Sequence, residues 1–235
     1  MANILNIDTS SMQCSVAVCK DGEVIMGLES SQKMDHSTSL APFVKQCMDF
    51  LQERGEKLDA ISVTNGPGSY TGLRIGLSMA KGLAYGLDVP LITLSSLEVM
   101  TVRAIFSYPD FNGDELIVPM VDARRMEVFT GVYDSALRLV IDEHPEILDE
   151  NSFSELKNKG KVLFIGDGSQ KFEPLYSGDN AVWLGSGMPH AKYMGALSEK
   201  YFKEKRFSDV AYTVPNYLKA YQTTLPKNKI LKENG

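Results

Sequence analysis

The chain repeats one order of strands and turns, and this internal repeat restricts the folds that it can adopt. A buried strand ending in Asp8 is followed, further along, by a Gly-Pro-Gly-Ser loop at residues 66–69. A second buried strand ending in Asp122 is followed by a Gly-Asp-Gly-Ser loop at residues 166–169. The interval between strand and loop is shorter in the second copy. The repeat predicts two related halves, of which the second is abbreviated.

Hydrophobic periodicity predicts the elements of the first half. Apolar residues recur every three or four positions from Leu40 to Leu51, which indicates an amphipathic helix. Ser39 is the expected N-cap of this helix and Gly55 its expected stop. Further helices are predicted at residues 71–86 and 96–106, and strands at residues 4–8, 15–19, 24–28, 59–64 and 90–94. The resulting order, βββαβαβα, is that of a mixed α/β unit.

Length and composition fit two globular domains. The 235 residues include 43% apolar and 23% charged residues, as in ordinary globular proteins. We predict a first domain at residues 1–106, a second at residues 107–225 and a flexible tail at residues 226–235, which has too few apolar groups to order itself. A helix that starts near Lys192 is expected to pack back on the first domain.

Charge and cysteine content narrow the classes of function. The net charge of −6 argues against bulk electrostatic capture of nucleic acid, so any RNA contact is expected to be local or shared with a partner. Cys14, Cys19 and Cys47 are odd in number and lie in apolar segments, which favours buried, reduced thiols and a cytoplasmic location. No apolar run approaches the ~18 residues of a membrane span, so no membrane partner is expected.

The segment from Asn65 to Gly76 joins a buried strand to a helix through glycines and a proline. Such a loop exposes backbone N–H groups at a helix N-terminus, which favours an anion. It is not a Walker loop, because no Gly-Lys-Ser/Thr follows, and Thr71 stands where a dinucleotide fingerprint has its third glycine. Generic phosphate motifs are therefore excluded.

Small residues follow this loop at helical spacing. Gly72, Gly76, Ala80 and Ala84 fall four apart, and Ser78, Gly82 and Gly86 form a second row beside them. Small side chains at this spacing let another element approach closely, either the chain's own sheet or a partner helix. We expect a partner, so that Gly76→Leu or Ala80→Glu would block docking in a folded monomer. The predicted docking face comprises Leu40, Phe43, Val44, Cys47, Phe50, Gly72, Gly76, Met79, Ala80, Leu83 and Ala84.

Four segments together carry a resemblance to a known family: Ile7-Asp8-Thr9-Ser10, the segment from Gly66 to Gly76, Val121-Asp122-Ala123-Arg124-Arg125 and Pro215-Asn216-Tyr217-Leu218. The chain resembles the TsaB (YeaZ) family, and its two halves resemble the actin-like (ASKHA) α/β fold. The resemblance implies a complex with TsaD and TsaE that forms threonylcarbamoyladenosine at adenosine 37 of tRNA. It also implies a homodimer when TsaD is absent. No cofactor is expected in this chain, and ATP and a divalent metal are expected in the partner subunits.

The residues that could carry chemistry are few. Paired histidines on a helix would be needed for a metal, whereas His36, His144 and His190 stand alone, so no metal site is expected. Asp8 and Asp122 lie where actin-like ATPases place carboxylates, although capping of the following turn is the simpler role. Possible nucleotide or anion ligands are Asp8, Thr9, Gly68, Ser69, Asp122, Arg124 and Gly168.

We therefore predict no catalytic residue in this chain, and a scaffold that activates the TsaD transferase. The alternative is an autonomous ATP-dependent small-molecule kinase or carbamoyl transferase that uses a cleft between Asp8, Gly68, Asp122 and Gly168. The hairpin at residues 122–127 is either a solvated turn or, through Arg124, a contact for phosphate or RNA.

Overall fold

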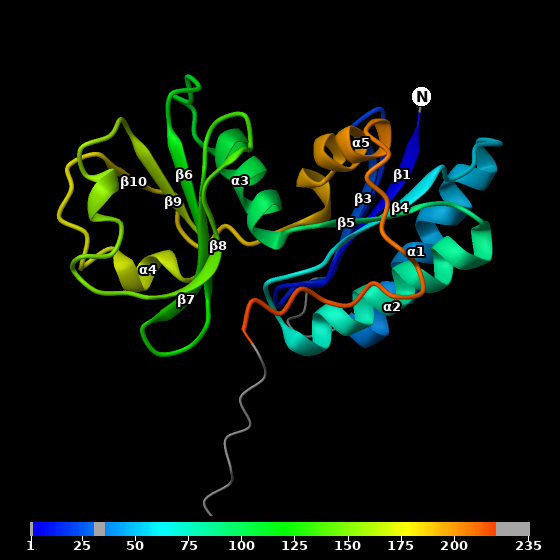
Figure 1. The fold of residues 1–235 in the computed structure, drawn as a ribbon. Helices are drawn as coiled ribbons and strands as arrows, with labels where there is room; N and C mark the ends of the chain where they lie inside the picture. Colours follow the sequence, from blue (N-terminus) through cyan, green and yellow to red (C-terminus); the bar gives the residue numbers. More distant parts are fainter. Residues whose placement is uncertain (1, 31–35, 220–235) are drawn as a thin grey trace, which may run out of the picture.

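A computed structural model describes residues 2–30 and 36–219. These residues form two five-stranded sheets, one in each half of the chain (Figure 1). The first sheet contains β1 (Asn3–Asp8), β2 (Ser15–Lys20), β3 (Glu23–Glu29), β4 (Ala60–Thr64) and β5 (Leu91–Leu94). The second contains β6 (Leu116–Asp122), β7 (Glu127–Tyr133), β8 (Leu139–Ile147), β9 (Val162–Ile165) and β10 (Ala181–Trp183).

The helices are α1 (His36–Glu53), α2 (Tyr70–Leu87), α3 (Ser96–Ser107), α4 (Ser169–Phe172) and α5 (Gly195–Lys203), with short 3₁₀ turns η1 (Ser154–Leu156) and η2 (Ala191–Tyr193). The predicted tail at residues 226–235 lies outside the described residues.

Both sheets have the same topology. The strand order of the first sheet is β3-β2-β1-β4-β5, and that of the second, read from the corresponding edge, is β8-β7-β6-β9-β10. The strand that begins each half is therefore central. β1 pairs antiparallel with β2 and parallel with β4, and β6 pairs in the same way with β7 and β9. The predicted actin-like fold of two related halves is confirmed. The second half is abbreviated, because the place of α1 is taken by the single turn η1.

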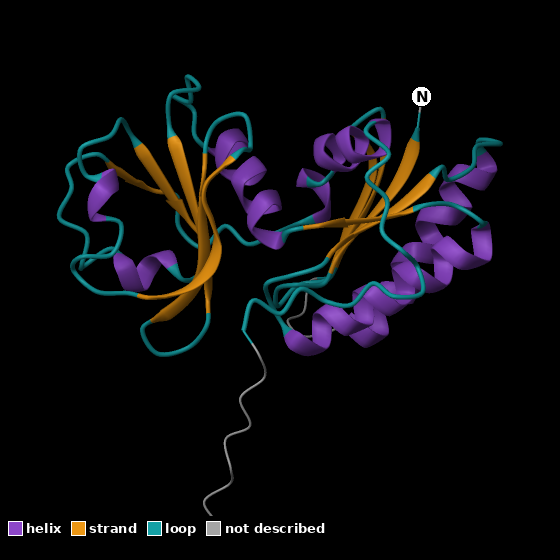
Figure 2. Cartoon of the chain, in the orientation of Figure 1, coloured by secondary structure: helices purple, strands orange, loops and turns teal. Residues whose placement is uncertain are grey.

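Helices cover both faces of the first sheet. α1 and α2 pack on one face, around Leu5, Ile7 and Val63. On the other face Leu197 and Tyr201 of α5 join Ile4 and Ile92, so the last helix packs back on the first sheet. Figure 2 shows α3 between the two sheets. This helix contributes to the cores of both halves, and the domain boundary at residues 106 and 107 stays a prediction.

Two local predictions were wrong. α1 begins at His36, three residues before the expected cap Ser39. β8 was missed, because its sequence mixes acidic residues with Pro145 and lacks a clear apolar alternation. β8 lies at the edge of the second sheet, where a proline is tolerated and one side of the strand needs no partner.

Candidate functional site

Asp8 at the end of β1 is completely buried. Its Oδ1 accepts hydrogen bonds from the backbone N and the Oγ of Ser10, at 3.1 and 2.6 Å, and from the Oγ1 of Thr64 at 2.6 Å. These bonds close the turn after β1 and tie it to β4. The geometry favours the capping role of Asp8 over a catalytic one, because none of its atoms reaches the surface.

The glycine loop packs directly on this turn. A Cβ on Gly68 would lie 2.3 Å from the carbonyl oxygen of Ser10, and a Cβ on Gly72 would lie 2.0 Å from that of Thr9. The N–H of Ser69 donates to the same Ser10 oxygen at 2.7 Å, and the Ser69 Oγ caps α2 by accepting from the N–H of Gly72 at 3.2 Å. Ser69 is therefore the N-cap of α2. The loop glycines thus allow close contact within the chain.

Residues 215–219 connect this loop with the second half (Figure 1, orange-red segment). The N–H of Asn216 donates to the carbonyl of Asn65 at 2.7 Å. Tyr217 stacks on Tyr70 with 5.0 Å between ring centroids. Lys219 forms an ion pair with Glu127 of β7 at 2.7 Å. The segment therefore bridges the first glycine loop and the β6–β7 hairpin.

Asp122, the counterpart of Asp8, is exposed. Its Oδ1 accepts from the Nζ of Lys171 at 2.6 Å, and its backbone N–H donates to the Oδ1 of Asp167 at 2.8 Å. Burial raises the pKa of the Asp167 carboxyl, and the charge of Asp122 adds to this shift. A Cβ on Gly168 would lie 2.7 Å from the Cγ1 of Val128, so this glycine also serves close packing.

The candidate nucleotide-binding residues therefore fall into two separate sets. Asp8 and Thr9 are buried beneath the first loop, whereas Asp122 and Arg124 are exposed at the second-half hairpin. A ligand that reaches Asp122 from solvent has no access to the Asp8 carboxylate in this arrangement. Nucleotide binding by this chain stays a prediction.

Most residues of the predicted docking face are not available to a partner. Seven of them are buried in the chain's own core: Leu40, Val44, Cys47, Gly72, Gly76, Ala80 and Ala84. A Cβ on Gly76 would lie 2.2 Å from the Oγ1 of Thr9, so the first small row packs on the turn after β1. Burial also raises the pKa of the Cys47 thiol to about 11, in keeping with a buried, reduced cysteine.

The second small row is open to solvent. Ser78, Gly82 and Gly86 are exposed, and a Cβ on Gly82 or Gly86 would have no neighbour within 4 Å among the residues that the structure describes. Ile75, Ser78, Met79, Gly82 and Leu83 line an open groove along α2, with Arg74 at one end. We call Ile75, Ser78, Met79, Gly82, Leu83 and Gly86 the open α2 face. Phe43 and Phe50 of the adjoining α1 are half-buried, as are Met79 and Leu83.

Two acids at the junction of the halves, the half-buried Glu143 and the buried Glu98, could not be found from the sequence, because their partners are distant in sequence. The Oε1 of Glu143 on β8 accepts hydrogen bonds from Ser95, the N-cap of α3, and from Tyr133. Glu98 accepts from the hydroxyl of Tyr201 at 2.9 Å. Burial raises the pKa of the Glu98 carboxyl.

Glu98→Gln is expected to flatten the pH dependence of stability. Above the ordinary pKa of 4.5 the unfolded chain releases the Glu98 proton while the folded chain still holds it, so the free energy of unfolding falls as pH rises toward the raised folded pKa. Glutamine does not titrate and retains an acceptor for Tyr201. Urea unfolding at a series of pH values measures this effect. The free energy of unfolding of the variant should increase relative to that of the wild type as pH rises. Parallel curves for the variant and the wild type would contradict the prediction.

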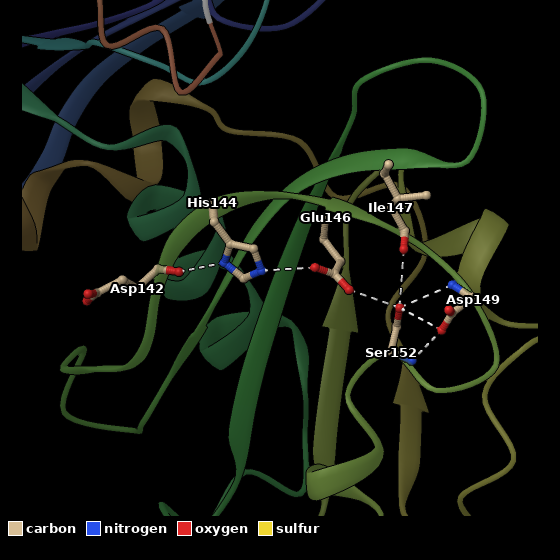
Figure 3. A network of polar contacts seen from close by, with 6 residues as sticks. All are labelled: Asp142, His144, Glu146, Ile147, Asp149 and Ser152. Atoms are coloured by element: carbon tan, nitrogen blue, oxygen red, sulfur yellow. Dashed lines mark hydrogen bonds and ion pairs between the residues drawn. The ribbon is translucent and has the colours of Figure 1, made fainter.

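A Ser-His-carboxylate network on β8 has the wrong order for catalysis (Figure 3). The Oγ of Ser152 donates to Glu146 Oε1 at 3.0 Å, and His144 Nε2 lies 3.3 Å from Glu146 Oε2. A serine nucleophile needs the imidazole at its hydroxyl, with the carboxylate behind it. Here the carboxylate lies between the two, so the network holds the turn after β8 together.

Within residues 2–30 and 36–219, no three His, Cys, Asp or Glu side chains are grouped so that they could hold a metal ion. In the same residues we find no helix with the length and apolar character that crossing a bilayer requires.

Comparisons with known proteins agree on one family. The family model "TsaD: tRNA N6-adenosine threonylcarbamoyltransferase" matches residues 28–227. The "tRNA threonylcarbamoyladenosine biosynthesis protein TsaB" of Bacillus subtilis is 34% identical, over 92% of this chain and 93% of that protein. The protein of the same name from Escherichia coli is 31% identical, over 92% and 94%. The solved structure "YeaZ from Pseudomonas aeruginosa" has a TM-score of 0.76 and 26% identity, over 92% of this chain and 100% of that one.

Proposed function

Because this chain belongs to the TsaB (YeaZ) family of the TsaD-related actin-like superfamily, we propose that it is a non-catalytic subunit that binds and activates TsaD during threonylcarbamoyladenosine formation on tRNA. The structural observation that supports this proposal is the open α2 face. It is an exposed helix surface with small residues at its centre and apolar residues around them.

Gly82 and Gly86 are not needed for close packing against any described part of the chain. Glycine within a helix costs up to ~1 kcal/mol relative to alanine. Gly76 on the buried side is needed because any side chain would strike Thr9, but Gly82 and Gly86 have free space where a Cβ would lie. A helix surface without Cβ atoms lets a second helix approach closely. We infer that Gly82 and Gly86 accommodate a helix from another protein.

TsaD is the partner that this surface fits best. The TsaD family model covers residues 28–227, so the transferase has segments equivalent to α1 and α2 of this chain. Two related helix pairs can meet about an approximate two-fold axis, as identical ones do in a symmetric dimer. We propose that a second copy of this chain occupies the same surface and forms a homodimer when TsaD is absent. TsaE and tRNA are expected to join through TsaD.

A non-catalytic role agrees with the closed first-half site. The Asp8 carboxylate caps its own turn, and the loop above it is in close contact with that turn. ATP and a divalent metal are assigned to the partner subunits. Contact with TsaD would act by favouring the active conformation of the transferase, which requires that this chain bind that conformation more tightly than the inactive one.

Reconstitution tests the proposal. Light scattering measures association of the purified chain with TsaD, and threonylcarbamoyl transfer to tRNA is then assayed with TsaD, TsaE, ATP and the threonylcarbamoyl donor, with and without this chain. We expect a defined complex and transfer that depends on the chain. No association and no dependence would overturn the proposal, and ATP-dependent turnover by the chain alone would favour an autonomous enzyme.

A further inference from the structure

The β6–β7 hairpin places two arginines in an unfavourable backbone conformation. Arg124 and Arg125 have φ angles of 73° and 51°, in the left-handed region that glycine and asparagine prefer. Both side chains are exposed. A strained backbone that carries charged side chains where glycine would fit better indicates that the side chains themselves are used.

The two acids of the hairpin itself are already paired with lysines. Asp122 forms an ion pair with Lys171 at 2.6 Å, and Glu127 forms one with Lys219 at 2.7 Å. Within the part of the chain that the structure describes, neither Arg124 nor Arg125 forms an ion pair. The hairpin therefore presents two guanidinium groups to solvent, although the whole chain has a net charge of −6.

An aromatic stack lies next to this hairpin. Arg74 lies over the ring of Tyr70 at 4.0 Å, and its Nε donates to the hydroxyl of Tyr217 at 3.0 Å. Tyr217 stacks on Tyr70, and Lys219, two residues further on, is the residue that pairs with the hairpin. Because the Cα atoms of Tyr217 and Lys219 are at most about 7 Å apart, the stack lies near the residue that pairs with Glu127 of the hairpin. We call Tyr70, Arg74, Arg124, Arg125 and Tyr217 the bridge strip.

We propose that the bridge strip binds RNA, namely the tRNA substrate of the assembled complex. Guanidinium groups match phosphate oxygens in geometry and charge, and aromatic side chains beside cationic ones are typical of surfaces that bind single-stranded RNA. Arg74 also borders the groove of the open α2 face, so a partner docked there would hold its tRNA beside the strip. The inference rests on the proposed function, because the tRNA must be brought by the partner.

The double variant Arg124→Gly/Arg125→Gly tests the strip without endangering the fold. Glycine suits both φ angles, so the thermal midpoint of the variant should equal or exceed that of the wild type. Binding of tRNA to the complex with TsaD is measured by fluorescence anisotropy at several salt concentrations. We expect the affinity to fall about tenfold, and the slope of log K against log salt to decrease by about 1.4 to 1.8, as for two lost phosphate contacts.

Two controls make the result specific. Lys205→Gly also replaces an exposed cation at a left-handed position, with φ of 54°, and should leave tRNA affinity unchanged. Arg124→Lys/Arg125→Lys keeps the charges and should restore most of the salt slope. If the double glycine variant still binds TsaD, and its tRNA affinity and salt slope equal those of the wild type, the bridge strip does not bind tRNA. Failure of the wild type to bind TsaD would instead overturn the proposed function.

Discussion

Gly82→Glu is expected to abolish association of this chain with TsaD while the chain itself stays folded. Gly82 lies at the centre of the open α2 face, and a Cβ added there has no neighbour within 4 Å among residues 2–30 and 36–219. Glutamate is also the better helix former, so the isolated chain should gain up to about 1 kcal/mol of stability. In a close helix contact, however, the carboxylate would be buried without a partner, which costs several kcal/mol. We expect the dissociation constant to rise at least about a hundredfold, together with loss of transfer to tRNA.

Gly160→Glu is the matched control for this experiment. Gly160 is also exposed, its nearest potential contact is 3.6 Å from a Cβ, and it belongs to the second half. It should associate with TsaD as the wild type does. If Gly82→Glu forms the complex with normal affinity in light scattering, the open α2 face is not the docking site.

Gly72→Ala is expected to destabilise the chain strongly, by about 3 kcal/mol, at the upper end of overpacking effects. The added methyl group would lie 2.0 Å from the backbone carbonyl oxygen of Thr9, an atom that cannot rotate away. Its matched variant in the same helix is Gly82→Ala, which has free space and should stabilise the chain by up to ~1 kcal/mol. Urea unfolding of the two variants measures both effects. Equal stabilities would show that Thr9 does not constrain the approach of α2.

The same geometry revises the expectation for Gly76→Leu and Ala80→Glu. Both were expected to leave a folded monomer, but Gly76 and Ala80 are buried against the chain's own sheet and turn. These variants are therefore expected to lose stability, so loss of tRNA modification in them would not identify a docking surface.

Much of the fold could be predicted from local sequence patterns. The periodicity of the first half indicated its strands and helices, because apolar spacing reflects the face that each element buries. The repeated Asp-turn and Gly-x-Gly-Ser loop indicated two related halves, and the segment from Gly66 to Gly76 carried the resemblance to the family. The capping role of Ser69 also depends only on neighbouring residues. β8 was missed, because an edge strand with polar residues has no strong pattern of its own.

The side of α2 that faces outward could be decided only by the tertiary structure. Both small rows have helical spacing, so the sequence determined that one flat face exists but not which row forms it. The contact that decides this joins Thr9 to Gly72, residues 63 positions apart, with a hydrogen bond from the Thr9 Oγ1 to the Gly72 carbonyl at 2.7 Å. Likewise, Asp8 and Asp122 end equivalent strands and a Gly-x-Gly-Ser loop packs closely in both halves, yet Asp8 is completely buried and Asp122 is exposed. Burial depends on which distant segments meet, and local patterns do not record that.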